Sequence, residues 1–265
     1  MKKVGFCFLI YDVIENEELW NLFFKNVDKN KYKIYIHFKV DKPLKYFEEF
    51  KLKNCIETEY GHVSLIHSHN LLFRSAYDDG CYKMINLSQS CIPFKNFYYI
   101  YNFLVKDNCA HFNIAPQLSC FPFCNNLLQY YDRESIQKSS EWFILNRKIF
   151  QSIMNYNVNE INEMYSEIFA PEEKFYITAV YHFKLQNEII TTPNLSNDAT
   201  TFTNWHDMGY KYSDPDNNGL KNYETISNEE ILYLMSSKCL FGRKFSNKCS
   251  DCLFNFDDYI NFITL

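Results

Sequence analysis

The uncharged run Val4-Gly5-Phe6-Cys7-Phe8-Leu9-Ile10 decides the fold class of this chain. A continuous apolar run of this length is typical of a strand that is buried on both faces of a sheet. It is too short to cross a membrane as a helix. Because Asp12, Glu15, Glu17 and Glu18 follow closely, the run also lacks the pattern of a signal peptide. We therefore expect the chain to open with a buried parallel strand.

Strand and helix patterns alternate after this run. Strand patterns cover residues 33–38 and 82–87, and apolar residues recur at helical spacing over residues 15–26, 62–77 and 97–105. Alternation of this kind predicts parallel strands joined by crossover helices. The first part of the chain is therefore expected to be a doubly wound α/β half.

The pattern is looser from about residue 109 onward. Ser227 and Glu230 have the spacing of a capping box, which predicts that a helix begins there. The other elements expected in this part are a short strand at 142–145, helices at 147–168 and 172–183, and a terminal strand at 240–241.

The composition excludes several classes of protein. Hydrophobic residues make up 47% of the 265 residues and aromatic residues 18%, which supports a large packed core and argues against disorder. The net charge of -5 argues against a general nucleic-acid-binding protein, which needs a basic face. We expect a soluble, cytoplasmic protein with no signal peptide and no membrane-spanning segment.

The ten cysteines do not indicate a disulfide framework, because a chain of this length can be stabilised by its core alone. Cys249-x-x-Cys252 and Cys120-x3-Cys124 have spacings compatible with zinc ligands, but no His-x3-5-His pair accompanies them. We expect buried free thiols and no bound metal.

A second stretch, Ala170-Pro171-Glu172-Glu173, precedes an aromatic and apolar run. Pro171 suits the first turn of a helix, and the two glutamates follow where the helix dipole favours negative charge. The local sequence alone is typical of a well-started helix with a solvated face. A carboxylate held at a helix start against apolar packing is also a good general base, and the rest of the chain favours this role for Glu173.

An α/β sheet of this kind binds nucleotides at the carboxyl ends of its strands, but the chain contains neither GxGxxG nor GxxxxGK(S/T). A diphosphate would then need a metal or cationic side chains. Asp214-Pro215-Asp216 is the one Asp-x-Asp pair, and its Asn- and Gly-rich surroundings are typical of a turn. Arg243 and Lys244 lie between Phe241 and Phe245, and in an acidic protein this pair is a better candidate for phosphate binding than an ordinary solvated edge.

Six short stretches follow one another in the order and spacing of one known enzyme family. They are Val4-Gly5-Phe6-Cys7-Phe8-Leu9 with Leu19-Trp20-x-x-Phe23-Phe24, Ile34-Tyr35-Ile36-His37, Asn86-Leu87-Ser88-Gln89-Ser90-Cys91-Ile92-Pro93-Phe94, Ser139-Ser140-Glu141-Trp142-Phe143-Ile144-Leu145-Asn146-Arg147, Ala170-Pro171-Glu172-Glu173 and Leu240-Phe241-Gly242-Arg243-Lys244-Phe245. The third, fourth and sixth are similar to the patterns L-S-x-S-C-x-P-L, G-S-Q-W-F-x-L-x-R and L-F-A-R-K-F. Together the stretches resemble the core-2/I-branching β-1,6-N-acetylglucosaminyltransferases, with their plant relatives and the peptide xylosyltransferases.

The resemblance implies a single GT-A-type glycosyltransferase domain over residues 1–265, with a Rossmann-like mixed sheet flanked by helices. A nucleotide-binding half would span about residues 1–108, and an acceptor-binding and catalytic half about residues 109–265. The implied enzyme inverts the anomeric centre without a metal. It moves a sugar from a UDP-sugar to a glycan or glycosylated acceptor and forms a β-linkage. The donor sugars of the relatives are GlcNAc, xylose and glucuronic acid.

The family's catalytic base falls on Glu173, and its phosphate-binding lysine falls on Lys244. A second family cation falls on Lys221, and Arg243 adjoins Lys244. In this mechanism the carboxylate takes the proton of the acceptor hydroxyl while fixed cations stabilise the leaving diphosphate, so no cofactor is expected. The remaining residues that we place on the donor side are His37, Tyr60 and Gly61.

On the acceptor side we place Glu141, Trp142 and Trp205. The sequence leaves two interpretations of Trp142 open, a platform for a sugar face and a core residue. His62 and His69, seven positions apart on one predicted helix, have a spacing compatible with a metal pair, but surface or half-buried histidines are the usual case.

The chain departs from the family in several places. Lys39 stands where animal members have an aspartate that is a candidate for contacting the nucleoside, so the resemblance assigns no nucleoside contact to this position. Glu172 replaces the aspartate of the pattern P-D-E. No stretch resembles the family's membrane anchor and stem, which underlies the cytoplasmic expectation. The alternatives are a catalytically inactive member that binds a glycan or nucleotide sugar, and an unrelated α/β protein with chance matches.

Overall fold

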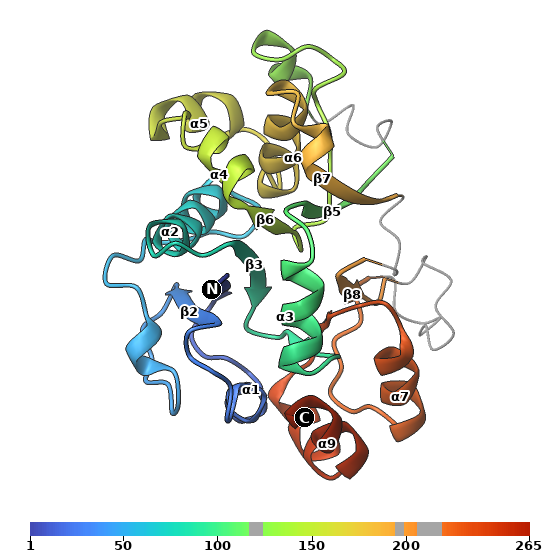
Figure 1. Cartoon of the computed structure of the whole chain (residues 1–265). Helices are drawn as coiled ribbons and strands as arrows, with labels where there is room; N and C mark the ends of the chain where they lie inside the picture. Colours follow the sequence, from blue (N-terminus) through green and yellow to red (C-terminus); the bar gives the residue numbers. More distant parts are fainter. Residues whose placement is uncertain (117–123, 194–198, 206–218) are drawn as a thin grey trace.

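A computed structural model describes residues 1–116, 124–193, 199–205 and 219–265 of the chain (Figure 1). Cys120 and Asp214-Pro215-Asp216 lie outside the described residues. The main sheet has the strand order β2-β1-β3-β6-β5-β7. Its strands are β1 (Val4–Ile10), β2 (Tyr32–Phe38), β3 (Lys83–Ser88), β5 (Ala110–Ile114), β6 (Ile144–Asn146) and β7 (Ile189–Pro193).

The main sheet is mixed. Strands β2 and β3 both pair with β1 in parallel, and β7 pairs in parallel with β5. Strand β6 is antiparallel to both of its neighbours, β3 and β5. As a result, the start of β6 lies at the same edge of the sheet as the carboxyl ends of β1 and β3. The sheet and its flanking helices are consistent with the expected GT-A class.

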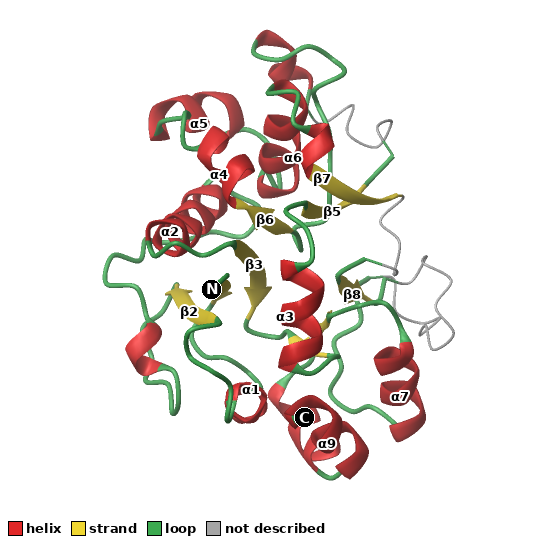
Figure 2. Cartoon of the chain, viewed as in Figure 1, coloured by secondary structure: helices red, strands yellow, loops and turns green. Residues whose placement is uncertain are grey.

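Helices cover both faces of this sheet, as Figures 1 and 2 show. Phe6 and Phe8 of β1 pack in one cluster with Trp20, whereas Cys7 belongs to the cluster on the opposite face. Both faces of β1 are therefore apolar, which explains the continuous apolar run. The helices on the face of Cys7 are α2 (Ser64–Asp78), α4 (Arg147–Ile153), α5 (Val158–Tyr165) and α6 (Glu172–His182), and those on the face of Phe6 are α1 (Glu17–Phe24) and α3 (Phe97–Val105).

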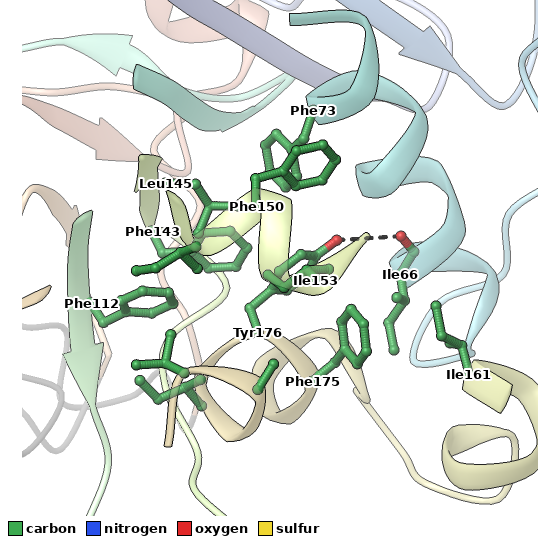
Figure 3. Packing of buried hydrophobic residues seen from close by; sticks show 14 of the residues in the cluster. Ile66, Phe73, Phe112, Phe143, Leu145, Phe150, Ile153, Ile161, Phe175 and Tyr176 are labelled. Carbon is green, nitrogen blue, oxygen red and sulfur yellow. Dashed lines mark hydrogen bonds between the residues drawn. The ribbon is translucent and has the colours of Figure 1, made fainter. Parts of the chain in front are cut away.

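Helix α6 is fixed by aromatic packing (Figure 3). The ring of Tyr176 lies 4.7 Å from that of Phe143 and 5.8 Å from that of Phe73. Its hydroxyl donates to the carbonyl of Ile66 in α2 at 3.3 Å and to Oδ1 of Asn70 at 2.9 Å. Buried aromatic residues dominate the energetics of a core, and a buried tyrosine hydroxyl needs a partner. These contacts hold the first turn of α6, with its two glutamates, in place against the sheet.

A smaller sheet has the strand order β4-β9-β8, and its central strand β9 ends at Arg243. Gly242 in its central strand lies so close to the buried ring of Phe94 that any Cβ at this position would overlap the ring. The elements of this part are β4 (Ile92–Pro93), β8 (Thr201–Thr203), α7 (Asn228–Ser236), β9 (Phe241–Arg243), α8 (Ser250–Phe254) and α9 (Asp257–Thr264).

Several expectations need correction. The expected helix over residues 147–168 is two helices, because Asn157 caps α5 in a capping box with Glu160. Ser227 caps α7 and accepts from the N–H of Glu230, but the Glu230 carboxylate accepts from the Tyr223 hydroxyl in place of closing a box. Strands β4, β5, β7 and β8 and helices α8 and α9 were not expected. Short 3-10 helices also occur at Glu48–Phe50, Asn125–Gln129, Gln186–Glu188 and Asn247–Cys249.

Across the described ranges, nine cysteines are present as free thiols. No group of three or more His, Cys, Asp or Glu side chains in these ranges is arranged to hold a metal ion. In the same ranges, no helix has both the length and the apolar character needed to cross a membrane.

Candidate functional site

Two adjoining cavities lie at the edge of the main sheet where β1 and β3 end. The first has a volume of about 420 Å³ and includes Ile10, Lys39 and Ser88 in its lining. The second has a volume of about 530 Å³ and includes Glu173 and Trp205. Volumes of this size are typical of ligand sites. Six residues line both cavities, and we call them the shared wall: Tyr60, Glu141, Trp142, Glu172, Arg243 and Lys244.

Backbone hydrogen bonds bring the motif stretches together at this edge. The N–H of Ser139 donates to the carbonyl of Glu173 at 2.8 Å. The side-chain amide of Asn86 donates to the carbonyl of Glu141 at 2.8 Å. The N–H of Phe245 donates to the carbonyl of Ser90 at 2.9 Å. Four of the six stretches therefore meet in one place although they are distant in the sequence.

The cationic part of the site is built by β9 and the residue after it. The guanidinium of Arg243 lies 4.0 Å from the centre of the Trp142 ring, which is a cation–π distance. Burial lowers the pKa of Arg243 and that of Lys244, and Arg243 further lowers the pKa of Lys244. Within the described part of the chain, no salt bridge involves Lys244, so its charge is available to a ligand. Two such cations beside a cavity suit a diphosphate.

Glu173 lines the second cavity only. Its Oε2 lies 3.2 Å from Nζ of Lys138, and both side chains are partly exposed. A carboxylate in this setting can both face a ligand and accept a proton from it. Lys138 was not expected, because it precedes the Ser139 stretch and no local pattern marks it.

Glu172 differs from the solvated residue that the sequence suggested. It is only 4% exposed, and its Oε2 has no hydrogen-bond partner in the described structure. Burial, strengthened by the nearby charge of Glu141, raises the pKa of Glu172 to about 8. Burial likewise raises the pKa of Glu141 to about 7, with Glu173 adding to the effect and Arg243 opposing it. The shared wall thus contains two carboxyl groups that resist full ionisation together.

Two loop segments, residues 60–61 and 169–170, border the site, and we call them the strap. The N–H of Ala170 donates to the carbonyl of Gly61 at 3.0 Å, and the rings of Tyr60 and Phe169 lie 5.8 Å apart. Gly61 has a φ of 71°, and a Cβ there would overlap Phe169. Ala170 has a φ of 48°, a costly value for a residue with a side chain. Both positions are adapted to bring Tyr60 against the cavities.

Four further predicted site residues remain, of which two line the cavities and two do not. Trp205 is 44% exposed and lines the second cavity. His37 is fully buried, and its Nε2 accepts from the N–H of Ile56 at 3.0 Å, away from both cavity linings. Lys221 has its Nζ 3.8 Å from Oε1 of Glu230 and lines neither cavity. Trp142 is nearly buried but also lines both cavities, so its two interpretations are compatible.

The histidine expectation is wrong for His69, which is fully buried behind the site. Its Nε2 lies 3.7 Å from Oε1 of Glu141. Burial lowers the pKa of His69 to about 3, so the imidazole is neutral and does not form an ion pair with Glu141 at neutral pH. The helical spacing of residues 62–77 already placed His69 with the apolar side chains, and that signal pointed to its burial.

Comparison with known proteins gives two findings. The family model described as "Core-2/I-Branching enzyme" matches residues 4–234 of this chain. A glycosyltransferase from rice, "Glycosyltransferase BC10" of Oryza sativa subsp. japonica, is 20% identical to it over 154 residues. That match covers 55% of this chain and 39% of the rice protein, so the chain matches well under half of its relative's length.

Proposed function

The chain belongs to the core-2/I-branching enzyme family, and on this premise we propose that it is an inverting glycosyltransferase that uses a UDP-sugar without a metal. The acceptor would be a glycan or glycosylated molecule, and the product a β-linkage. The observation that carries the proposal is that Glu173 and the pair Arg243 and Lys244 line one continuous site. Base and leaving-group cations are the two requirements of such a transfer.

In this proposal the diphosphate lies against Arg243 and Lys244, beside the first cavity. The acceptor hydroxyl lies in the second cavity, within reach of Glu173. As the acceptor oxygen bonds to C1 of the sugar, the C1–O bond to UDP breaks on the opposite face. The hydroxyl proton passes to the Glu173 carboxylate, and the charge that develops on UDP is stabilised by the two cations.

The other residues have supporting roles in this proposal. Tyr60 and Gly61 form the strap at the donor, while His37 holds the segment after Glu48–Phe50 through its bond to Ile56. Glu141, Trp142 and Trp205 contact the sugars. Lys221 contributes less, because Glu230 is its nearest charge. Residues up to about 108 supply most of the donor side and later residues most of the acceptor side, although one sheet joins them.

A panel of UDP-GlcNAc, UDP-xylose and UDP-glucuronic acid, with UDP alone for comparison, tests the proposal. A ligand that binds only the folded state raises the melting temperature, by an amount set by its concentration relative to its Kd. We expect UDP and at least one donor to raise it, and that donor to release UDP when an acceptor is present. A protein that none of these nucleotides stabilises would contradict the proposal.

One observation favours a second candidate, a family member that binds its ligand without turnover. The proposed base is paired with Lys138 at 3.2 Å, and this contact occupies one of its carboxylate oxygens. This candidate predicts stabilisation by UDP and by a UDP-sugar with no UDP release in any acceptor mixture. The Lys138→Met variant would then gain no activity either.

A further inference from the structure

The shared wall holds two carboxyl groups, that of Glu172, which is buried, and that of Glu141, which is partly exposed, and the mechanism described above makes no use of their charge. Glu172 is the more buried of the two, and one of its oxygens has no hydrogen-bond partner in the described structure. A buried polar atom without a partner is costly, so its presence at a cavity points to a ligand group that completes it. Glu141 is held beside it by the hydrogen bond from Asn86 to its carbonyl.

The position of this pair relates it to the transferred sugar. This step rests on the proposed function, in which the diphosphate lies at Arg243 and Lys244 and the acceptor hydroxyl lies at Glu173. The sugar must then lie between these two points. Glu141 and Glu172 line both cavities, and so they border the space between them.

The nearby cations are already engaged. Lys138 pairs with Glu173 at 3.2 Å, and Arg243 stacks on Trp142 beside the position of the diphosphate. His69 approaches Glu141 but is neutral at physiological pH, because burial keeps its pKa at about 3. Lys244 is assigned to the diphosphate, and Lys39 lines the first cavity only, so in the described part of the chain no cation of the shared wall is left to balance a further anion on the sugar.

We propose that Glu141 and Glu172 form a charge filter that admits neutral sugars and excludes sugars that carry a carboxylate. A protonated carboxyl group both donates and accepts hydrogen bonds, which suits the hydroxyl groups of a neutral sugar. A uronic acid would bring a third carboxylate into a site of low polarity, where repulsion between like charges is strong.

The filter differs from simple steric exclusion in its response to pH. Burial raises the pKa of Glu141 to about 7 and that of Glu172 to about 8, so the pair gains negative charge between pH 6 and pH 8.5. The uronate carboxylate stays ionised throughout this range. The other titratable groups that face the pair are His69 of α2, Cys91 before β4, Glu173, Lys174 and Tyr176 of α6, Arg243 of β9 and Lys244 directly after it.

Of these groups, Lys244 has its pKa lowered by burial, and loss of its charge at high pH would weaken every UDP-sugar equally. The ratio of two affinities therefore reports the filter. UDP-glucose and UDP-glucuronate form a matched pair, because they differ only at C6. We expect calorimetry on the whole chain at pH 8.5 to give a Kd for UDP-glucuronate at least about tenfold above that for UDP-glucose. At pH 6 the ratio of the two Kd values should be smaller.

The variants Glu172→Gln and Glu141→Gln should each reduce the difference in Kd between UDP-glucuronate and UDP-glucose at pH 8.5. The double variant should nearly remove this difference. Glu167→Gln is the matched control, because it removes the same charge from an exposed residue outside both linings and should leave the difference intact. Equal affinity for the two donors in the natural protein, or a difference that is the same at both pH values, would overturn the filter alone. Failure to bind UDP and both donors would overturn the proposed function and the filter together.

Discussion

Arg243 stacks on Trp142, with its guanidinium carbon 4.0 Å from the centre of the indole ring. The Nε of Arg243 is buried without a hydrogen-bond partner in the described structure, so stacking is what holds the side chain in place. An arginine fixed in this way keeps its outer N–H groups in a defined plane for phosphate oxygens. Lys244, which follows it directly, has no salt-bridge partner in the described part of the chain and lines both cavities.

Lys244→Ala should weaken binding of UDP and of UDP-sugars. A charge-assisted contact is typically worth about 1.5–3 kcal/mol, so the Kd should rise by roughly tenfold or more. Lys221→Ala should have a smaller effect, because Lys221 lies outside both cavity linings and faces Glu230. Isothermal titration of UDP into each variant measures both effects. Unchanged affinity in both variants would place the diphosphate elsewhere.

Chelation tests the role that we give to the cations. If Arg243 and Lys244 stabilise the leaving diphosphate, excess EDTA should leave the rate of UDP release nearly unchanged. Asp214-Pro215-Asp216, the one Asp-x-Asp sequence, is the alternative source of a metal site. A rate that falls in EDTA and returns with Mn2+ would contradict the cationic mechanism and direct attention to those aspartates.

The contact between Gly242 and Phe94 gives a stability prediction. The resembling family pattern has alanine and leucine at these two positions, and this chain has a smaller residue facing a larger one. Gly242→Ala alone should lower the free energy of unfolding by roughly 1–3 kcal/mol, because the added methyl group overlaps the buried Phe94 ring.

The Phe94→Leu exchange provides the control. Leucine leaves space beside the strand, so Gly242→Ala should cost less in the Phe94→Leu background than in the natural chain. Urea denaturation of the four proteins gives this coupling as a double-mutant cycle. Additive effects would mean that the ring moves away freely and that the two exchanges are unrelated.

Some elements of this fold can be predicted from the sequence and others cannot. Elements with a strong apolar pattern were predicted well: β1 from a continuous apolar run that is buried on both faces, and α3 from apolar residues at helical spacing. Strands β7 and β8 are short and rich in threonine, and β7 is mostly exposed. Their pairing depends on β5 and β9, which are distant in sequence, so no local signal marks them.

The same distinction holds for the site, where the sequence predicts some residues but not the burial or pairing of others. Glu173, Trp142, Arg243 and Lys244 lie in stretches with a recognisable order, and the structure places all of them around two adjoining cavities. The burial of Glu172 depends on how α6 packs against the sheet, and a helix start looks the same whether it is solvated or buried. Neither the burial of Glu172 nor the pairing of Lys138 with Glu173 could be predicted from the spacing of residues alone.

The buried carboxyl group of Glu172 predicts a dependence of stability on pH. Glutamate ordinarily titrates near 4.5, whereas Glu172 in the folded protein titrates near 8. Between these values the folded state retains a proton that the unfolded state releases, so the free energy of unfolding falls as pH rises. Glu172→Gln removes this dependence. Relative to the natural chain, the variant should therefore gain roughly 1–3 kcal/mol in stability between pH 5 and pH 8.5.

Urea denaturation at the two pH values measures this gain. His37, His69 and His111 have lowered pKa values and act in the opposite direction, since the unfolded state takes up their protons below about pH 6.5. They are present in both proteins and cancel in the difference. A stability difference that stays constant from pH 5 to pH 8.5 would mean that Glu172 is ionised in the folded state.

Glu173 is the proposed general base of the transfer. As a general base it should matter for transfer and hardly at all for donor binding, because it faces the second cavity and not the first. General bases typically contribute about 10²–10⁴-fold to the rate. Glu173→Gln should therefore lose at least about a hundredfold in kcat while its Kd for UDP is unchanged. Glutamine keeps the size of the side chain but cannot take the proton.

The neighbouring Glu172 is a poor control for this experiment, because it is buried in the shared wall. Glu167→Gln is better, since Glu167 is exposed and lies outside both linings. Lys138→Met separates two further explanations. If Lys138 only orients the base, its loss should lower kcat modestly, whereas a base that the ion pair holds inactive should become more active. Normal turnover by Glu173→Gln on a working acceptor would mean that Glu173 is not the base and only favours the start of helix α6, as the local sequence alone suggested.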